Sequence, residues 1–159
     1  MNERGFTVIE LVATMVIIAA LSVFVLPRLD LAAFERADFR QQVLSALRYA
    51  QKAATASGCE VAVDLDSGGN RYGVLVRSGA TGGQSCGSAG FTEYLRHPAR
   101  NGDYTGQAES ATDLQTNGRI VFDGFGAYDA DDSSVPSPPL VTVSGATIRI
   151  DPVTGYVHE

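Results

Sequence analysis

Residues 6–26 read Phe6-Thr-Val-Ile-Glu10-Leu-Val-Ala-Thr-Met-Val-Ile-Ile-Ala-Ala-Leu-Ser-Val-Phe-Val-Leu26, and 17 of these 21 residues are apolar. At 1.5 Å per residue, a helix of this length spans about 31 Å, which matches the hydrocarbon core of a membrane. A helix satisfies its own backbone hydrogen bonds in lipid, where no water can do so. The stretch therefore predicts a transmembrane helix over 6–26.

The mean composition of the whole chain hides the difference between the apolar run and the more polar residues that follow it. Its 159 residues are 45% hydrophobic and 19% charged, with a formal net charge of −6, and the mean hydropathy is close to zero. The length suits one domain with a core of its own, and two cysteines exclude a disulfide-dense scaffold and a four-cysteine zinc site. Residues 54–159 carry six basic and thirteen acidic side chains, so we expect no nucleic-acid partner.

The residues around the apolar run argue against a cleaved secretory signal. Such a signal has a shorter apolar stretch followed by a small-x-small cleavage site, whereas this run continues into Pro27-Arg28-Leu29-Asp30. Positive charge does not set the orientation, because only Arg4 precedes the run while Arg28, Arg36 and Arg40 follow it.

Glu10 is the one charged residue inside the apolar run. A carboxylate at the centre of a membrane helix costs about 2.5–3.5 kcal/mol, and such groups are functional by default. On chemistry alone two interpretations stay open. Glu10 either has a function within the membrane or lies near the interface and reaches water.

The first ten residues resemble the processing site of type IV prepilins and pseudopilins. Met1-Asn-Glu-Arg-Gly5 is followed by Phe6-Thr-Val-Ile-Glu10 at the head of an apolar helix. In that family a prepilin peptidase cuts after the glycine, the new N-terminal phenylalanine is N-methylated, and a glutamate five residues into the mature chain assists assembly. The resemblance covers about residues 1–55. It implies that Gly5 ends the leader, Phe6 is methylated, Glu10 is the assembly glutamate and Pro27 kinks the helix.

The chemistry of Glu10 agrees with this resemblance. Cleavage after Gly5 would free a positive amine on Phe6, and a buried carboxylate needs such a partner. In a stack of staggered helices, Glu10 of one subunit could face Phe6 of its neighbour. The charge would then set the register of the assembly.

Helical periodicity continues beyond Pro27. Apolar residues recur every three or four positions, at Phe39, Val43, Leu47, Ala50 and Ala54. Ser57-Gly58 supplies a stop, because glycine suits the left-handed position after a last helical turn. We expect one helix of about 52 residues, roughly 78 Å long, over 6–57. Its stripe would pack on a β-domain, or alternatively form a coiled coil with a partner.

The residue pattern after Gly58 is typical of strands and turns. Residues 60–65 alternate in polarity, and Asp66-Ser-Gly-Gly-Asn70 leads into 71–77, which is typical of a hairpin. Further strands are expected at 91–96, 119–123, 140–143, 147–151 and 155–158. The fold class is therefore α+β and pilin-like, with a leader at 1–5, a long helix at 6–57 and an antiparallel β-rich domain at 58–159.

Two cysteines, Cys59 and Cys86, lie in the β-rich part. The resemblance places that part in the periplasm, where disulfides persist. We expect these two residues to form a disulfide that pins the glycine-rich loop 78–90 beside the end of the helix.

Motifs for catalysis are weak. Gly83-Gln-Ser-Cys-Gly87 matches the G-x-S-x-G of serine hydrolases, but that motif needs a buried strand before it and a helix after it. The histidines, His97 and His158, lie next to a proline and near the C-terminus. We expect no enzyme activity, no catalytic residue, no cofactor and no small-molecule substrate.

Two charged groups have simpler explanations than a binding site. Four aspartates could collect calcium, which takes several oxygen ligands, but a solvated acidic loop is the simpler interpretation. Four arginines could form a patch for DNA, although the acidic domain would oppose it. The aspartates are Asp123, Asp129, Asp131 and Asp132, and the arginines are Arg71, Arg77, Arg96 and Arg100.

A narrower resemblance concerns residues 44–64 and the closing Asp-Pro-Val-Thr-Gly-Tyr-Val at 151–157. They are similar to pseudopilin H, to FimT-like minor pilins, and most of all to the minor pilin C family of mannose-sensitive haemagglutinin (MSHA) pili. The resemblance implies a structural minor pilin, anchored by a single pass in the inner membrane with a periplasmic C-terminal domain. Its partners would be prepilin peptidase and other major and minor pilins. The alternatives are a pseudopilin H-like subunit of type II secretion, and a tip adhesin or DNA-binding minor pilin.

Overall fold

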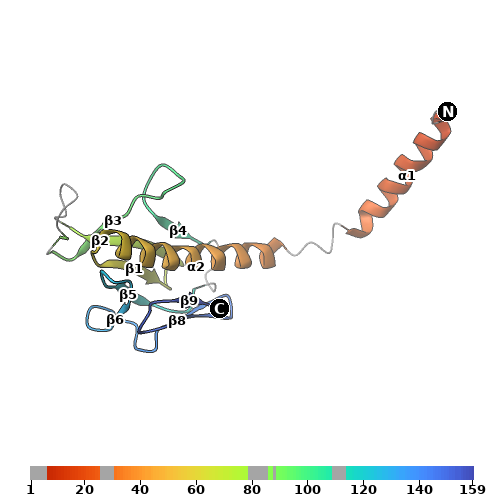
Figure 1. The fold of residues 1–159 in the computed structure, drawn as a ribbon. Helices are drawn as coiled ribbons and strands as arrows, with labels where there is room; N and C mark the ends of the chain where they lie inside the picture. The colour runs from red at the N-terminus through yellow and green to blue at the C-terminus, as the bar shows by residue number, and fades with distance from the viewer. Residues whose placement is uncertain (1–6, 26–30, 79–85, 88, 109–113) are drawn as a thin grey trace. The chain divides into compact units, whose positions relative to one another are not determined.

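The structure, a computed structural model, describes residues 7–25, 31–78, 86–87, 89–108 and 114–159. These residues form an α+β protein with two helices and two antiparallel sheets (Figure 1). The chain divides into two compact units, Met1–Phe34 and Glu35–Glu159. The α+β fold class predicted from the sequence is thus confirmed.

The first unit holds helix α1 (Val8–Val25). Thr7 begins it, because its carbonyl and hydroxyl oxygens both accept a hydrogen bond from the Glu10 N–H, at 3.1 and 3.3 Å. The described side chains of α1 are exposed. Within the described residues, neither helix has both the length and the apolar character that crossing a membrane requires. The transmembrane assignment of 6–26 stays a prediction.

Helix α2 (Leu31–Ser57) carries the apolar stripe that the sequence predicted. It ends at Ser57, and Gly58 follows with a φ of +68° and donates its N–H to Ala54 O at 2.8 Å. All five stripe residues are buried, namely Phe39, Val43, Leu47, Ala50 and Ala54. The stripe is thus the seam between α2 and the sheets of the same unit. Residues 26–30 lie outside the described residues, so one continuous helix and a kink at Pro27 stay predictions.

The larger sheet has the order β3-β2-β1-β5-β6, with β4 also paired to β2. Strands β1 and β2 form the predicted hairpin, in which Val61 pairs with Val76 and Asp66 with Arg71. At the hairpin turn the Asp66 carboxylate accepts the N–H groups of Gly68 and Gly69 at 3.0 and 3.1 Å. The strands are β1 (Val61–Asp66), β2 (Arg71–Arg77), β3 (Phe91–Tyr94), β4 (Thr105–Gln107), β5 (Gly118–Phe122) and β6 (Tyr128–Asp129).

The smaller sheet has the order β7-β8-β9, and its strands are β7 (Leu140–Val143), β8 (Ala146–Ile150) and β9 (Val157–His158). Ser144 and Gly145 connect β7 to β8 with φ angles of +51° and +77°, the conformation of a two-residue hairpin loop. The predicted strands in this region are confirmed to within one or two residues. Strands β4 and β6 were missed because three and two residues are too few to show an alternation.

Both sheets contribute to one hydrophobic core, which α2 covers (Figure 1). Among the described residues, the buried hydrophobic side chains all lie between Phe39 and Val157. The unit Glu35–Glu159 therefore has a hydrophobic core of its own, as units that fold independently do. Fully buried members of this core include Leu47, Val63, Ile120, Phe122, Val141 and Ile148.

Candidate functional site

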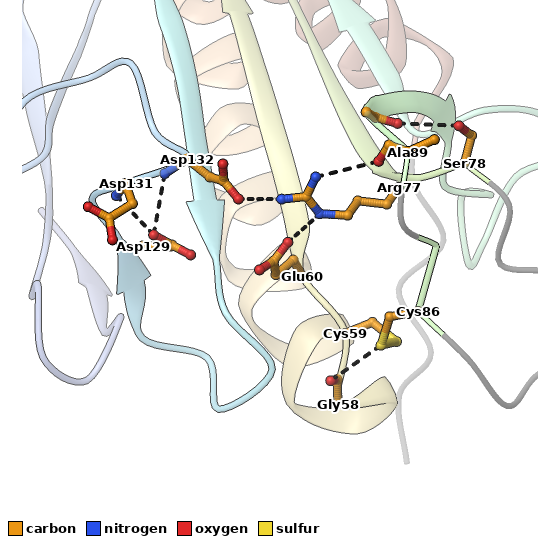
Figure 2. A network of polar contacts seen from close by, with 11 residues as sticks. Gly58, Cys59, Glu60, Arg77, Ser78, Cys86, Ala89, Asp129, Asp131 and Asp132 are labelled. Carbon is orange, nitrogen blue, oxygen red and sulfur yellow. Dashed lines mark hydrogen bonds and ion pairs between the residues drawn. A yellow bond between two sulfur atoms is a disulfide. The ribbon is translucent and has the colours of Figure 1, made fainter.

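A cluster of charged residues surrounds Arg77, the last residue of β2 (Figure 2). Its guanidinium donates to the carboxylates of Glu60 and Asp132, and to the carbonyl oxygen of Ala89 at 3.4 Å. The hydrogen bond to Glu60 raises the pKa of Arg77 above its usual value. Arg77 thus holds together three segments that are far apart in the sequence.

An aromatic ring lies beneath this arginine. The Arg77 Cζ atom is 4.5 Å from the centroid of the Phe91 ring, and the Arg119 Cζ atom is 5.3 Å from it. Arg119 in turn makes a two-pronged ion pair with Asp64, at 2.5 and 2.7 Å, which raises the pKa of Arg119. Phe91 also belongs to a small second apolar cluster, with Ala62, Leu75 and Val121. The two guanidinium groups therefore cover apolar surface as well as balancing charge.

The four aspartates for which calcium was the lesser alternative, beside a solvated acidic loop, do not come together as one set. Carboxylate oxygens of Asp129 and Asp132 lie within 4.8 Å of each other and of Glu60, which was not predicted. The Asp129 carboxylate already accepts the N–H groups of Asp131 and Asp132, at 2.9 and 3.4 Å. Arg77 pairs with Glu60 and Asp132, so a cation of the chain itself offsets part of the negative charge of this cluster.

Asp123 has a local structural role in place of the one proposed for it. Its Oδ1 atom accepts the N–H groups of Phe125 and Ala127, at 2.9 and 2.8 Å, and closes a turn.

Glu60 was not predicted as a member of this cluster, although its position next to the predicted hairpin was a signal for it. The hairpin register that pairs Val61 with Val76 places Glu60 opposite Arg77.

The disulfide between Cys59 and Cys86 is present, with Cα atoms 5.3 Å apart (Figure 2). It joins the residue just after Gly58, at the end of α2, to Cys86 within the loop 78–90, as predicted. Gly87 follows at a position with no room for a side chain, because an added Cβ would lie 2.2 Å from Ser78 O. The disulfide therefore closes a tightly packed junction.

A pocket of about 550 Å³ opens beside the disulfide. It lies between the Arg77 network and the Asp123 turn, and Phe125 stands at its edge. Its lining includes Gly58, Cys59, Glu60, Arg77, Asp123 and Phe125. The described part of this lining holds no pair of nucleophile and base.

The remaining candidates from the sequence have other contacts. Residues 83–85 of the hydrolase-like motif lie outside the described residues. The His97 Nδ1 atom accepts the N–H groups of Ala99 and Arg100, both at 3.1 Å, and the His97 ring stacks on Tyr104. His158 stacks on Tyr156 at 5.4 Å between ring centroids.

The four arginines do not form a basic patch. Arg71 and Arg77 occupy opposite ends of β2, and each is paired with a carboxylate. Arg96 and Arg100 lie in the loop between β3 and β4, and both are exposed.

The processing residues fall mainly outside the described part of the chain, which excludes Gly5, Phe6 and Pro27. Glu10 lies in the first turn of α1 and is exposed. Comparisons with family models, with curated proteins and with solved structures found no match for this chain.

Replacing Arg77 by methionine tests the charge network. Methionine keeps an apolar stem over Phe91 but leaves Glu60 and Asp132 without their cation, so we expect a loss of about 1–2 kcal/mol in the free energy of unfolding. Urea unfolding of the unit Glu35–Glu159 measures it. The matched control is Arg71→Met, because Arg71 pairs with Asp66 at a more exposed site, with 60% of the Arg71 side chain exposed against 23% for Arg77. Equal losses in the two variants would contradict a structural role for the network.

Proposed function

We propose that this chain is a minor pilin of the MSHA type, a structural subunit that primes or joins a type IV pilus. The observation that carries the proposal is the order of residues at the N-terminus. A glycine–phenylalanine junction is followed by Glu10 at the head of an apolar helix. The division of the chain into a helical unit and an α+β unit with its own core supports the proposal.

The apolar surface of α1 is consistent with such a subunit. Its large side chains, among them Val8, Ile9, Met15 and Ile18, are more than half exposed. Apolar surface of this extent is rarely left in water and indicates contact with lipid or with other helices. In the proposed assembly cycle, the helix is first inserted in the inner membrane and then packs with the helices of other subunits. The α+β unit lies in the periplasm.

Processing is the first step of the proposed cycle. Prepilin peptidase would cut after Gly5, and the amine of Phe6 would be methylated and remain positive. Glu10 of an incoming subunit would then face that amine on its neighbour. A carboxylate in an apolar surrounding is stabilised by such a partner, so the pair would set the register of the growing filament.

A deletion strain complemented with variants of the full chain tests this function. We expect the parent chain and Glu35→Val to restore pili, and Glu10→Val to be cleaved and retained in the membrane fraction but to fail in assembly by at least tenfold. Glu35 is the matched control because it is an exposed glutamate in the first turns of α2. Gly5→Val should leave an uncleaved precursor, identified by its intact mass. Normal piliation by Glu10→Val would contradict the proposal.

The same strain separates the proposal from the secretion alternative. A pseudopilin H-like subunit would leave pili intact on deletion and abolish export of secreted enzymes, whereas a minor pilin would show the opposite pattern. Scoring pili, secretion and surface attachment together in one strain therefore shows whether the chain serves a pilus or a secretion system.

A further inference from the structure

Exposed apolar side chains of the unit Glu35–Glu159 concentrate on two turns. Among the described residues of this unit, the large hydrophobic side chains with the highest exposure are Phe125 at 91%, Val153 at 78% and Tyr156 at 61%. Phe125 lies in the turn 123–126 and the other two lie in the turn 151–156. Single exposed apolar residues are ordinary in folded proteins. Here, however, the three most exposed large apolar side chains of the described part of the unit all lie in two turns, which needs an explanation.

The two turns touch each other at glycines. Gly126 and Gly155 have φ angles of +83° and +64°, and a Cβ atom on Gly155 would lie only 1.8 Å from Gly126 O. Both turns also rest on Gln51 of α2, whose Nε2 atom donates to Thr154 O at 2.9 Å. The two turns that carry Phe125, Val153 and Tyr156 thus form one joined structure against the C-terminal half of α2, which we name the turn surface.

Each turn is fixed internally by an aspartate. Asp123 accepts two backbone N–H groups, as described above, and the Gly126 N–H donates to Asp123 O at 2.8 Å. The Asp151 carboxylate accepts the N–H groups of Val153 and Thr154, at 3.0 and 2.8 Å, and the Thr154 hydroxyl at 2.9 Å. The hydrogen bonds from Thr154 lower the pKa of Asp151.

The internal hydrogen bonds of the two turns favour binding because they fix the backbone in advance. Side chains held on preorganised turns lose little conformational entropy when they become buried, and exposed aromatic residues of this kind are the usual anchors of protein interfaces. Neither Phe125 nor Val153 stabilises the fold in any visible way, since both side chains are largely in solvent.

The charge of the unit selects among possible partners. Residues 54–159 carry thirteen acidic and six basic side chains. An anionic lipid surface would be repelled by this field, and a second copy of the chain carries the same sign of charge. The complementary partner is a protein surface that is apolar at its centre and bordered by lysine and arginine.

We propose that the turn surface is the docking site for a different subunit of the same filament, one that presents an apolar depression with a basic border. The identity of the partner rests on the proposed function. Phe125 is the central anchor, and Val153 and Tyr156 enlarge the buried apolar area around it.

A photo-crosslinking side chain at position 125 of the full chain tests this inference in cells that assemble filaments. We expect an adduct with one other filament subunit, identified by mass. In the same chain, Val153→Ser with Tyr156→Ser should reduce the adduct at least fivefold. Tyr94→Ser is the matched control, because Tyr94 is an exposed aromatic residue on β3, at the edge of the larger sheet opposite β6, and it should leave the adduct unchanged. Thermal unfolding of each variant verifies that the fold is kept.

Other outcomes overturn the inference in distinguishable ways. Adducts with a second copy, with lipid or with a receptor outside the filament would assign the turn surface to a different partner. A chain that is present in filaments but yields no adduct at 125 would contradict the docking site and leave the proposed function intact. Absence of the chain from every filament, together with normal behaviour of Glu10→Val, would contradict the proposed function and the partner with it.

Discussion

Phe122→Ala is expected to lower the free energy of unfolding of the unit Glu35–Glu159 by about 3–5 kcal/mol. Among the described residues, Phe122 is the largest fully buried side chain, and it lies in the core between α2 and the two sheets. It pairs with Val61 on one side and Tyr128 on the other. Its strand, β5, is hydrogen-bonded to β1 on one side and to β6 on the other, so its backbone has little freedom to move into the cavity that the substitution opens.

Phe125 provides an internal control for this prediction. It lies three residues further along the chain but is 91% exposed, so Phe125→Ala should change the free energy of unfolding by no more than about 0.5 kcal/mol. Urea unfolding of the two variants gives both values on one fragment. A loss near 1 kcal/mol for Phe122→Ala would mean that the core repacks around it. A loss of several kcal/mol for Phe125→Ala would mean that the exposed phenylalanine supports the fold, which would weaken the case for a docking role.

Local patterns in the sequence predicted the parts of the fold that depend on near neighbours. The stripe from Phe39 to Ala54 has helical spacing, and it is buried throughout. The turn between Asp66 and Asn70 carries two glycines and an asparagine at φ +47°, so the hairpin was readable from the turn residues alone. Both patterns involve residues that are close together in the sequence.

Contacts between distant segments could not be predicted in the same way. Asp132 joins Arg77 across 55 residues, and nothing in the sequence around either one indicates the other. Glu60 was within reach of prediction, because the hairpin register sets it opposite Arg77. The contact of Gly126 with Gly155 depends on how two turns pack against α2, which no local pattern encodes.

The disulfide was predicted for a different reason, because the resemblance places the β-rich part in the periplasm, where disulfides persist. Its contribution is expected to be large. Cys59→Ser together with Cys86→Ser should lower the free energy of unfolding by about 3–4 kcal/mol, because the bond restricts a loop of 27 residues in the unfolded chain. Serine replaces both sulfurs so that no single thiol is left to form other bridges.

The source of that loss can be separated from a packing effect. Cys86 is exposed and Cys59 is half-buried, so the double variant removes little buried apolar surface from the folded unit. The dependence of unfolding free energy on urea concentration should become steeper, because an unfolded chain without the crosslink exposes more surface. The near-ultraviolet circular dichroism of the folded state should lose only the contribution of the disulfide itself, and reduction of the parent unit should reproduce the double variant. A native spectrum altered beyond that contribution, with an unchanged urea dependence, would instead locate the effect in the folded junction of Gly58, Cys86 and Gly87. In that case the disulfide would shape the pocket beside Phe125 rather than constrain the unfolded chain.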